Sequence, residues 1–192
     1  MHWSCCDIAS FSADELQRAY EKLSPSRKEH IDRLHRQKNK DCSLAAEVLV
    51  QRLLEEHYGV TGAELHRKEN GQPYLTGCDL YVSISHCEQK VACAVSCDPV
   101  GIDIERIRPV NLKLCRHVCV VEEKAYVLGE TRGYEDRECQ DSDVLRRFFE
   151  IWTAKEAFFK KNGTGITDLK SVNILPLPRQ VHMVEDYLVQ IL

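Results

Sequence analysis

The sequence lacks any long apolar segment. Its longest unbroken apolar run is five residues, at positions 91–95, whereas a helix that crosses a bilayer needs about 20. The first ten residues, MHWSCCDIAS, show no basic stretch followed by an apolar one, which is the pattern of a secretory signal. We therefore expect a cytoplasmic protein with no membrane partner.

A strong excess of charge of either sign is also missing. The 26 Lys and Arg residues face 30 Asp and Glu residues, which gives a formal net charge of −4. Because nucleic-acid-binding domains usually carry a clear positive excess, we expect no nucleic-acid partner. The charge is unevenly distributed: residues 22–40 hold seven Lys or Arg and two acids, and residues 130–143 hold six acids and two Arg. The sequence thus predicts a basic end and an acidic loop.

Ten cysteines are present, but no two of them are spaced as Cys-x-x-Cys. Disulfides are not expected in a protein without an export signal. The pairs Cys93 with Cys97 and Cys115 with Cys119 stand four apart and leave a metal-ligand role open. Structural zinc sites normally show tighter paired spacing, so we interpret the cysteines as reduced thiols.

Hydrophobic periodicity predicts both helices and strands in each half of the 192-residue chain. Helices are expected at 12–22, where Ser12 and Glu15 form a capping box, at 43–59 and at 144–161. Alternating strands are expected at 80–85 and 100–105, with 91–95 as the hairpin partner of the first. The sequence therefore predicts an α+β fold of two similar lobes, residues 1–98 and 99–192.

Asp103 and Glu105 lie two residues apart on the strand expected at 100–105. Their side chains would project from one face with Cα atoms about 7 Å apart, close enough to share one hard cation. The ordinary charged face of an edge strand is the alternative interpretation of this pair.

The helix expected at 144–161 adds three charged residues near its apolar stripe. Lys155 falls in the middle of the stripe, so its ammonium either reaches outward or meets an anion inside a cleft. Glu156 and Lys160 stand four apart at the edge of the stripe and form either a surface ion pair or part of a site. Three carboxylates from Asp103, Glu105 and Glu156 beside lysines would suit Mg²⁺ on a polyphosphate.

Four segments resemble, in order, the motifs of the 4′-phosphopantetheinyl transferases. They are NGQPY at 70–74, SISHC at 83–87, VGIDIE at 100–105 and FFEIWTAKEAFFKKNGTGI at 148–166. The similarity spans roughly residues 23–175 and is greatest to the longer, monomeric type of the family. It implies a pseudo-twofold pair of lobes, each a small, mainly antiparallel sheet packed with helices, with coenzyme A in a cleft between them.

The resemblance implies transfer of 4′-phosphopantetheine from coenzyme A to a serine of an apo acyl, peptidyl or polyketide carrier protein, which releases 3′,5′-ADP. It implies Mg²⁺, with Mn²⁺ as a substitute, on Asp103, Glu105 and Glu156, and catalysis by Glu156, Lys160 and Asp103. Glu123 resembles a further family carboxylate near the metal. The implied contacts to coenzyme A come from Arg27, His30, Ser43, Gln72, Ser85, His86, Lys155 and Lys160.

Two positions depart from the family pattern. Gln72 replaces a common lysine, and His30 stands where a basic contact is usual, so we expect weaker affinity for coenzyme A. Two other functions stay open. One is a metal-dependent nucleotide phosphohydrolase, which would use the same carboxylates, and the other is a degenerate member that binds coenzyme A or a carrier domain without turnover.

Overall fold

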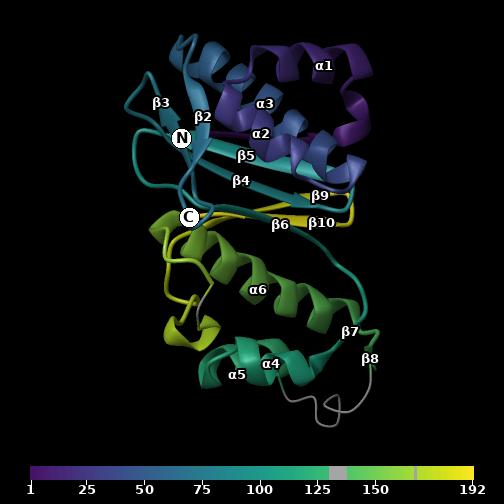
Figure 1. The fold of residues 1–192 in the computed structure, drawn as a ribbon. Coiled ribbons are helices and arrows are strands. Elements are labelled where there is room, and N and C mark those ends of the chain that lie inside the picture. Colours follow the sequence, from purple (N-terminus) through teal and green to yellow (C-terminus); the bar gives the residue numbers. More distant parts are fainter. Residues whose placement is uncertain (130–137, 167) are drawn as a thin grey trace.

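The computed structural model describes residues 1–129, 138–166 and 168–192. Figure 1 shows four layers: helices α1 to α3, a first sheet, a second sheet, and helix α6. This arrangement confirms the predicted α+β class. Of the predicted acidic loop at 130–143, residues 130–137 lie outside the described residues.

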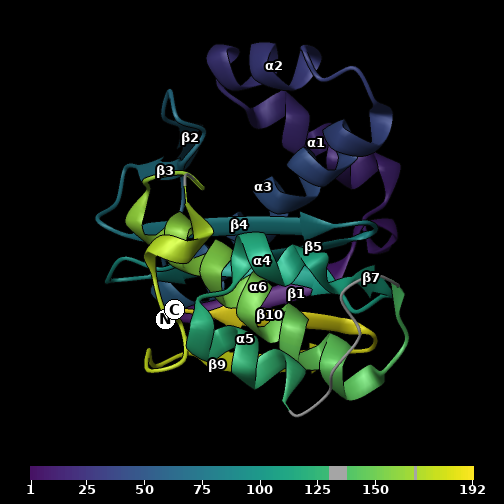
Figure 2. The same ribbon diagram turned by 90° about the horizontal axis from the view of Figure 1, so that it is seen from below.

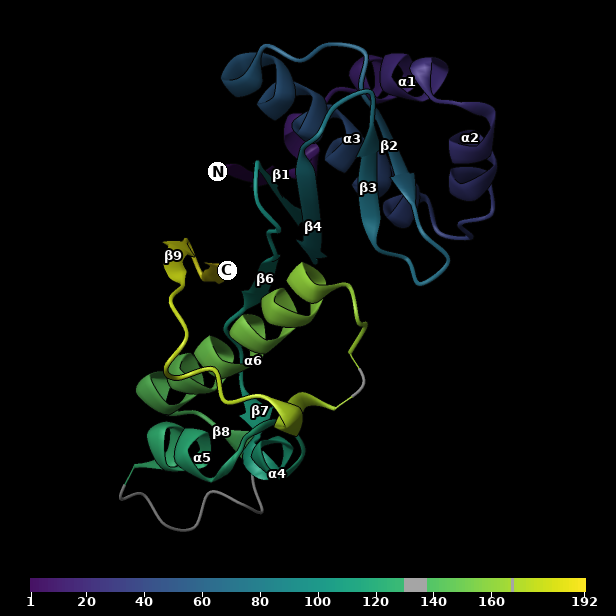
Figure 3. The ribbon, with the colours of Figure 1, turned by 90° about the vertical axis from the view of Figure 1, so that its left-hand side faces the viewer.

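The first sheet consists of β1 (His2–Asp7), β5 (Lys90–Ser96) and β4 (Tyr81–Cys87), in that order and antiparallel. Helices α1 (Ala13–Lys22), α2 (Pro25–Asp32) and α3 (Gln37–Tyr58) lie on its outer side, and α3 packs directly on β5. The hairpin of β2 (Glu64–Arg67) and β3 (Pro73–Thr76) stands beside α3 (Figure 3). Ser12 caps α1 as predicted, because its side chain accepts from the Glu15 amide.

The second sheet has the order β6 (Ile102–Arg106), β10 (Tyr187–Ile191) and β9 (Gln180–Val184). Its outer side is covered by α6 (Ser142–Asn162), with α4 (Cys115–Val118) and α5 (Val121–Leu128) beyond it (Figure 2). Two-residue strands β7 (Val110–Asn111) and β8 (Glu138–Cys139) pair with each other. Short 3₁₀ turns lie at Ile8–Ser10, Leu112–Leu114 and Leu169–Ser171.

The two sheets pack face to face through an apolar cluster. Ala92 and Ala94 of β5 meet Ile102 and Ile104 of β6 and Val189 of β10 in this cluster. Because side chains alternate along a strand, the residues of β6 that alternate with these isoleucines face the other way, toward α6. Asp103 and Glu105 occupy those positions. The same alternation that builds the core therefore directs both carboxylates to the helix.

Helix α6 approaches the start of β6 closely at Gly101. A Cβ at this glycine would lie 1.8 Å from the Ala157 carbonyl oxygen and 2.7 Å from the Lys161 amide nitrogen. Backbone hydrogen bonds in both directions between Gly101 and Leu192 hold this part of the sheet in register. Only a residue without a side chain permits this backbone contact.

A buried ion pair connects α5 to α6. Lys155 and Glu123 are both fully buried, with Nζ and Oε2 2.7 Å apart. The ammonium also donates to the carbonyl oxygens of Leu169 (2.5 Å) and Val172 (2.7 Å). Glu123 in turn accepts from the amides of Val120 (2.9 Å) and Ile174 (2.7 Å). This pair therefore holds α5, α6 and the segment that leads to β9 together.

None of the helices in the described ranges combines the length and the apolar character that a membrane span requires.

Gly101→Ala should lower the free energy of unfolding by about 3 kcal/mol, because the added methyl group would overlap the backbone of α6. Gly59→Ala is the matched control: Gly59 has φ +63° and open space around it, so only the left-handed backbone is penalised, by roughly 1 kcal/mol. Urea unfolding measures both. Equal losses in the two variants would contradict the close contact.

Lys155→Met should cost about 3 to 5 kcal/mol of unfolding free energy, because it leaves the Glu123 carboxylate buried without its cation. Adding Glu123→Gln should recover part of that loss, since the unpaired charge is then removed. Urea unfolding of the two single variants and the double variant tests this. Additive losses would show that the two side chains do not act as a pair.

Candidate active site

Three side chains from three elements meet where β4, β6 and α6 come together. Lys160 Nζ lies 2.6 Å from Asp103 Oδ1 and 2.8 Å from Ser85 Oγ. The Ser85 hydroxyl donates to the same oxygen of Asp103 at 2.7 Å. Each strand places its residue by alternation, and the last turns of α6 place the lysine. The structure thus brings together predicted residues that are 75 positions apart in sequence.

Asp103 is almost fully buried, at 1% exposure, and its two oxygens differ in their surroundings. Oδ1 accepts from Ser85 and Lys160, whereas Oδ2 is buried without a hydrogen-bond partner. A buried acceptor without a partner costs free energy, and such an oxygen suits a cation that completes its coordination.

Glu156 and Glu105 lie close enough to Asp103 for their charges to interact. Burial, and then repulsion by Asp103, raises the pKa of Glu156 to about 7, while Lys160 opposes the shift. Burial and Asp103 also raise the pKa of Glu105. Glu105 accepts a hydrogen bond from the Cys87 thiol at 3.5 Å. The three predicted metal-ligating carboxylates therefore lie within electrostatic range of one another.

Convergence stops short of an assembled metal-ligand set. Among the described residues, no three His, Cys, Asp or Glu side chains are grouped closely enough to hold an ion. The ten cysteines are free thiols and form no such group either. The carboxylates nonetheless fit a divalent cation by their chemistry. Asp103 has an unsatisfied oxygen, and Asp103 and Glu105 both repel the charge of Glu156, which a cation would relieve.

Several cations surround His86, which is at the end of β4. Desolvation lowers the pKa of its ring, and Lys160, Arg67 and Lys38 lower it further, while Asp103 acts in the opposite direction. Arg67 is held at the end of β2 by a 2.8 Å hydrogen bond from Nη1 to the Gly71 carbonyl. We did not predict Arg67 or Lys38 from the sequence. Lys38 falls within the basic stretch at 22–40, but nothing in the sequence marked Arg67, because its approach to His86 depends on the placement of the β2–β3 hairpin.

Arg27, Ser43 and His30 form a second group of predicted residues. Arg27 is buried, donates from Nη2 to Ser43 Oγ at 2.9 Å, and pairs through Nε with Glu47 at 3.4 Å. Its Nη1 is buried without a partner, so a donor remains for an anion. Desolvation lowers the pKa of His30, and Arg27 and Arg67 lower it further. Arg67 therefore acts on both His30 and His86, so the group around Arg27 and the group around His86 lie within electrostatic range of each other.

Gln72 contacts the C-terminal end of α6. Its Nε2 donates to the Lys160 carbonyl at 3.5 Å, and its Oε1 accepts from Lys68 Nζ at 2.9 Å. The adjacent Asn70 donates to the Gly163 carbonyl at 2.8 Å. The NGQPY turn therefore links the β2–β3 hairpin to α6, and Lys68 provides a cation close to the position where the family pattern has lysine.

The structure places Lys155, which we predicted to contact coenzyme A, inside the protein. Its ammonium is fully buried and uses Glu123 and two carbonyl oxygens as partners. The anion that the apolar stripe implied is therefore a side chain of α5. Glu123 likewise faces Lys155 inside the protein core, in the same buried ion pair. The partner could not be identified from the periodicity of α6 alone.

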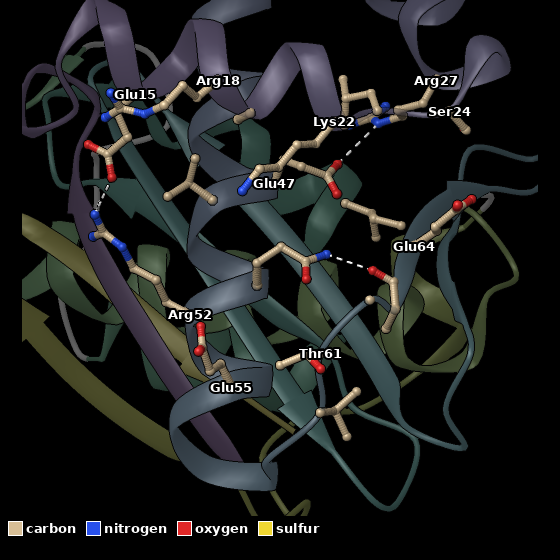
Figure 4. A pocket seen from close by; sticks show the side chains of 18 residues that line it. Glu15, Arg18, Lys22, Ser24, Arg27, Glu47, Arg52, Glu55, Thr61 and Glu64 are labelled. Carbon is tan, nitrogen blue, oxygen red and sulfur yellow. Dashed lines mark hydrogen bonds and ion pairs between the residues drawn. The ribbon is translucent and has the colours of Figure 1, made fainter.

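A separate cavity of about 600 Å³ lies between α1, α3 and the chain that enters β2 (Figure 4). Its wall carries both signs of charge, including the Arg52–Glu15 and Arg27–Glu47 ion pairs. None of the three clustered carboxylates lines it. Arg27 is at its edge, so the cavity borders the second basic group but not the carboxylate cluster.

Comparison with known proteins identifies relatives with one common description. The family model of the 4′-phosphopantetheinyl transferase superfamily matches residues 99–189. The chain is 27% identical over 160 residues to 4′-phosphopantetheinyl transferase Sfp of Bacillus subtilis (strain 168), covering 81% of this chain and 67% of that protein. It is 32% identical over 126 residues to 4′-phosphopantetheinyl transferase gsp of Aneurinibacillus migulanus, covering 65% and 49%.

A third relative is 4′-phosphopantetheinyl transferase HetI of Nostoc sp. (strain PCC 7120 / SAG 25.82 / UTEX 2576), at 28% identity over 180 residues, covering 90% of this chain and 68% of that protein. The chain thus spans about half to two thirds of the length of these relatives. The matches include the strand and the helix that carry the clustered carboxylates. By its sequence, the chain is similar to the 4′-phosphopantetheinyl transferase superfamily.

Proposed function

We propose that the protein transfers the 4′-phosphopantetheine group of coenzyme A to a serine hydroxyl of an apo carrier protein. One observation carries the proposal: Asp103 keeps a buried, unsatisfied oxygen, pairs with Lys160 and interacts electrostatically with Glu105 and Glu156, in a chain similar to this superfamily. In the reaction the serine oxygen forms a bond to the phosphorus that bears pantetheine. The bond from that phosphorus to 3′,5′-ADP breaks, and the serine proton is released.

Asp103, Glu105 and Glu156 would hold Mg²⁺, or Mn²⁺ in its place. A bound divalent cation supplies charge neutralisation for the pyrophosphate and the leaving group. Glu156 is the candidate acceptor of the serine proton, because its raised pKa of about 7 lies near the working pH of a general base. Lys160 would bind a phosphate oxygen and stabilise the charge that builds up during transfer.

The basic groups around His86 and Arg27 would bind the remaining phosphates of coenzyme A. Ser85 accepts a hydrogen bond from Lys160, and the ring of His86 interacts electrostatically with Lys160, Arg67 and Lys38. The unpartnered Nη1 of Arg27, next to Ser43 and His30, suits a phosphate at the adenosine end. Gln72 contacts the Lys160 carbonyl and Lys68. We propose that the loss of a lysine at this position is offset in part by Lys68.

We propose further that residues 1–98 and 99–192 are two lobes related by a pseudo-twofold axis, with coenzyme A between them in a monomer. Two similarities support this. The β4–β5 and β9–β10 hairpins both turn through a glutamate with positive φ, Glu88 (51°) and Glu185 (56°). Helices α3 and α6 also cover the outer faces of the two sheets in the same way (Figure 1).

Acyl, peptidyl and polyketide carriers are all candidate acceptors.

The intact masses of an apo acyl carrier protein and an apo peptidyl carrier domain, after incubation with this protein, coenzyme A and Mg²⁺, test the proposal. We expect a gain of one phosphopantetheine that EDTA abolishes. Asp103→Asn should slow the gain by about 100-fold, because it weakens charge stabilisation in the transition state. Asp14→Asn, on the exposed first turn of α1, is the matched control and should be neutral.

Full activity of Asp103→Asn would contradict the assignment of the site. Coenzyme A cleavage without an acceptor would point to a phosphohydrolase instead. Binding of coenzyme A with no change of either carrier would indicate a non-catalytic binding protein.

Glu156→Gln should raise the melting temperature at pH 8 by more than at pH 5. The folded-state pKa of about 7 is above the ordinary glutamate value of 4.5, so the folded protein binds more protons than the unfolded chain between these values. Stability from the protonated carboxyl is therefore lost as the pH rises through 7. Thermal unfolding without divalent ions measures this, with the exposed Glu122→Gln on α5 as control. A difference in melting temperature between Glu156→Gln and the unmodified protein that does not change with pH would contradict the repulsion between the carboxylates.

A further inference from the structure

Lys160 is bonded directly to a residue that the proposed function assigns to the metal. Its ammonium lies 2.6 Å from Asp103 Oδ1, and Ser85 Oγ bridges the two groups. We infer that Lys160 and the divalent cation compete for the Asp103 carboxylate, so that the cation and coenzyme A bind cooperatively. This inference rests on the proposed function and concerns the order of events at the same site.

An ion bound to Asp103 would stand beside the lysine. Asp103 Oδ1 already accepts from Ser85 and Lys160, and the buried Oδ2 is the oxygen left for the ion. An ion that enters would place its charge within a few ångströms of the ammonium, in an environment that screens poorly because Asp103 is buried. The cation and the ammonium therefore compete for one carboxylate.

Lys160 is able to leave this position. Its side chain keeps 28% of its surface exposed, and it lies in the last turn of α6, which ends at Asn162. A lysine has four rotatable side-chain bonds and three donors, so the ammonium can turn outward and still be satisfied. Lys160, Arg67 and Lys38 all act as cations on His86, so an ammonium that gives up its carboxylate in this region is unfavourable without another anion.

The pyrophosphate of coenzyme A resolves this conflict. It offers an anion to the displaced ammonium and further oxygens to the incoming ion. Binding of either ligand therefore lowers the cost of binding the other, and by linkage the two effects on affinity are equal. A metal ion alone should bind weakly, and coenzyme A should raise its affinity by about tenfold or more, within the usual range of such coupling.

Mn²⁺ binding, followed by the EPR signal of the free ion, tests the inference on the whole chain with and without coenzyme A and with no carrier present. In Lys160→Met, Mn²⁺ alone should bind at least about fivefold tighter than in the unmodified protein, while coenzyme A should no longer raise its affinity. Lys161→Met is the matched control: it removes the same charge one residue further on and should retain the coupling. Circular dichroism confirms that each variant is folded.

Two results would overturn the inference. One is that Lys160→Met binds Mn²⁺ no tighter than the unmodified protein when coenzyme A is absent. The other is that the gain in affinity is the same with and without coenzyme A, which would describe simple charge repulsion instead of exchange at Asp103. Failure of the proposed function is distinguishable, because carriers would then gain no mass and Asp103→Asn would leave Mn²⁺ affinity in the presence of coenzyme A unchanged.

Discussion

The backbone contact between β6 and α6 at Gly101 determines where the charged groups of the site lie. Because no side chain separates strand and helix there, Asp103 comes within 2.6 Å of Lys160. The isoleucines that alternate with Asp103 and Glu105 are buried against the first sheet, so the strand cannot rotate without exposing its core face. Packing therefore enforces a gathering of carboxylates that electrostatics alone would oppose.

Two lysines of α6, five residues apart, have opposite roles. Lys155 is fully buried, and its bonds to Glu123 and two carbonyl oxygens satisfy it. Lys160 is partly exposed and faces an incomplete site, in which Asp103 keeps an oxygen without a partner. The first lysine stabilises the helix that the second one needs. Helix α6 thus carries a fully satisfied buried lysine and, further along, a lysine at an unsatisfied carboxylate. Such a combination is expected where a site is arranged to receive a charged ligand.

Much of this arrangement follows from local patterns in the sequence. Alternation identified β4, β5 and β6, and periodicity identified α1, the core of α3 and α6, although α3 begins at Gln37, six residues before the expected 43. The family resemblance also implied that Asp103 and Lys160 belong to one site. The partner of Lys155 could not be predicted, since Glu123 reaches it only when α5 packs on α6. Nor could Arg67 and Lys38, whose positions depend on how the β2–β3 hairpin and α3 are placed by the tertiary fold.

A crystal structure of the protein with coenzyme A and Mg²⁺ tests the central claim most directly. We expect the ion at Asp103, Glu105 and Glu156, with the Lys160 ammonium moved from Asp103 to a phosphate oxygen and Arg27 Nη1 bonded to a phosphate. Coenzyme A in the cavity between α1 and α3, or an ion bound elsewhere while Lys160 stays on Asp103, would contradict the account.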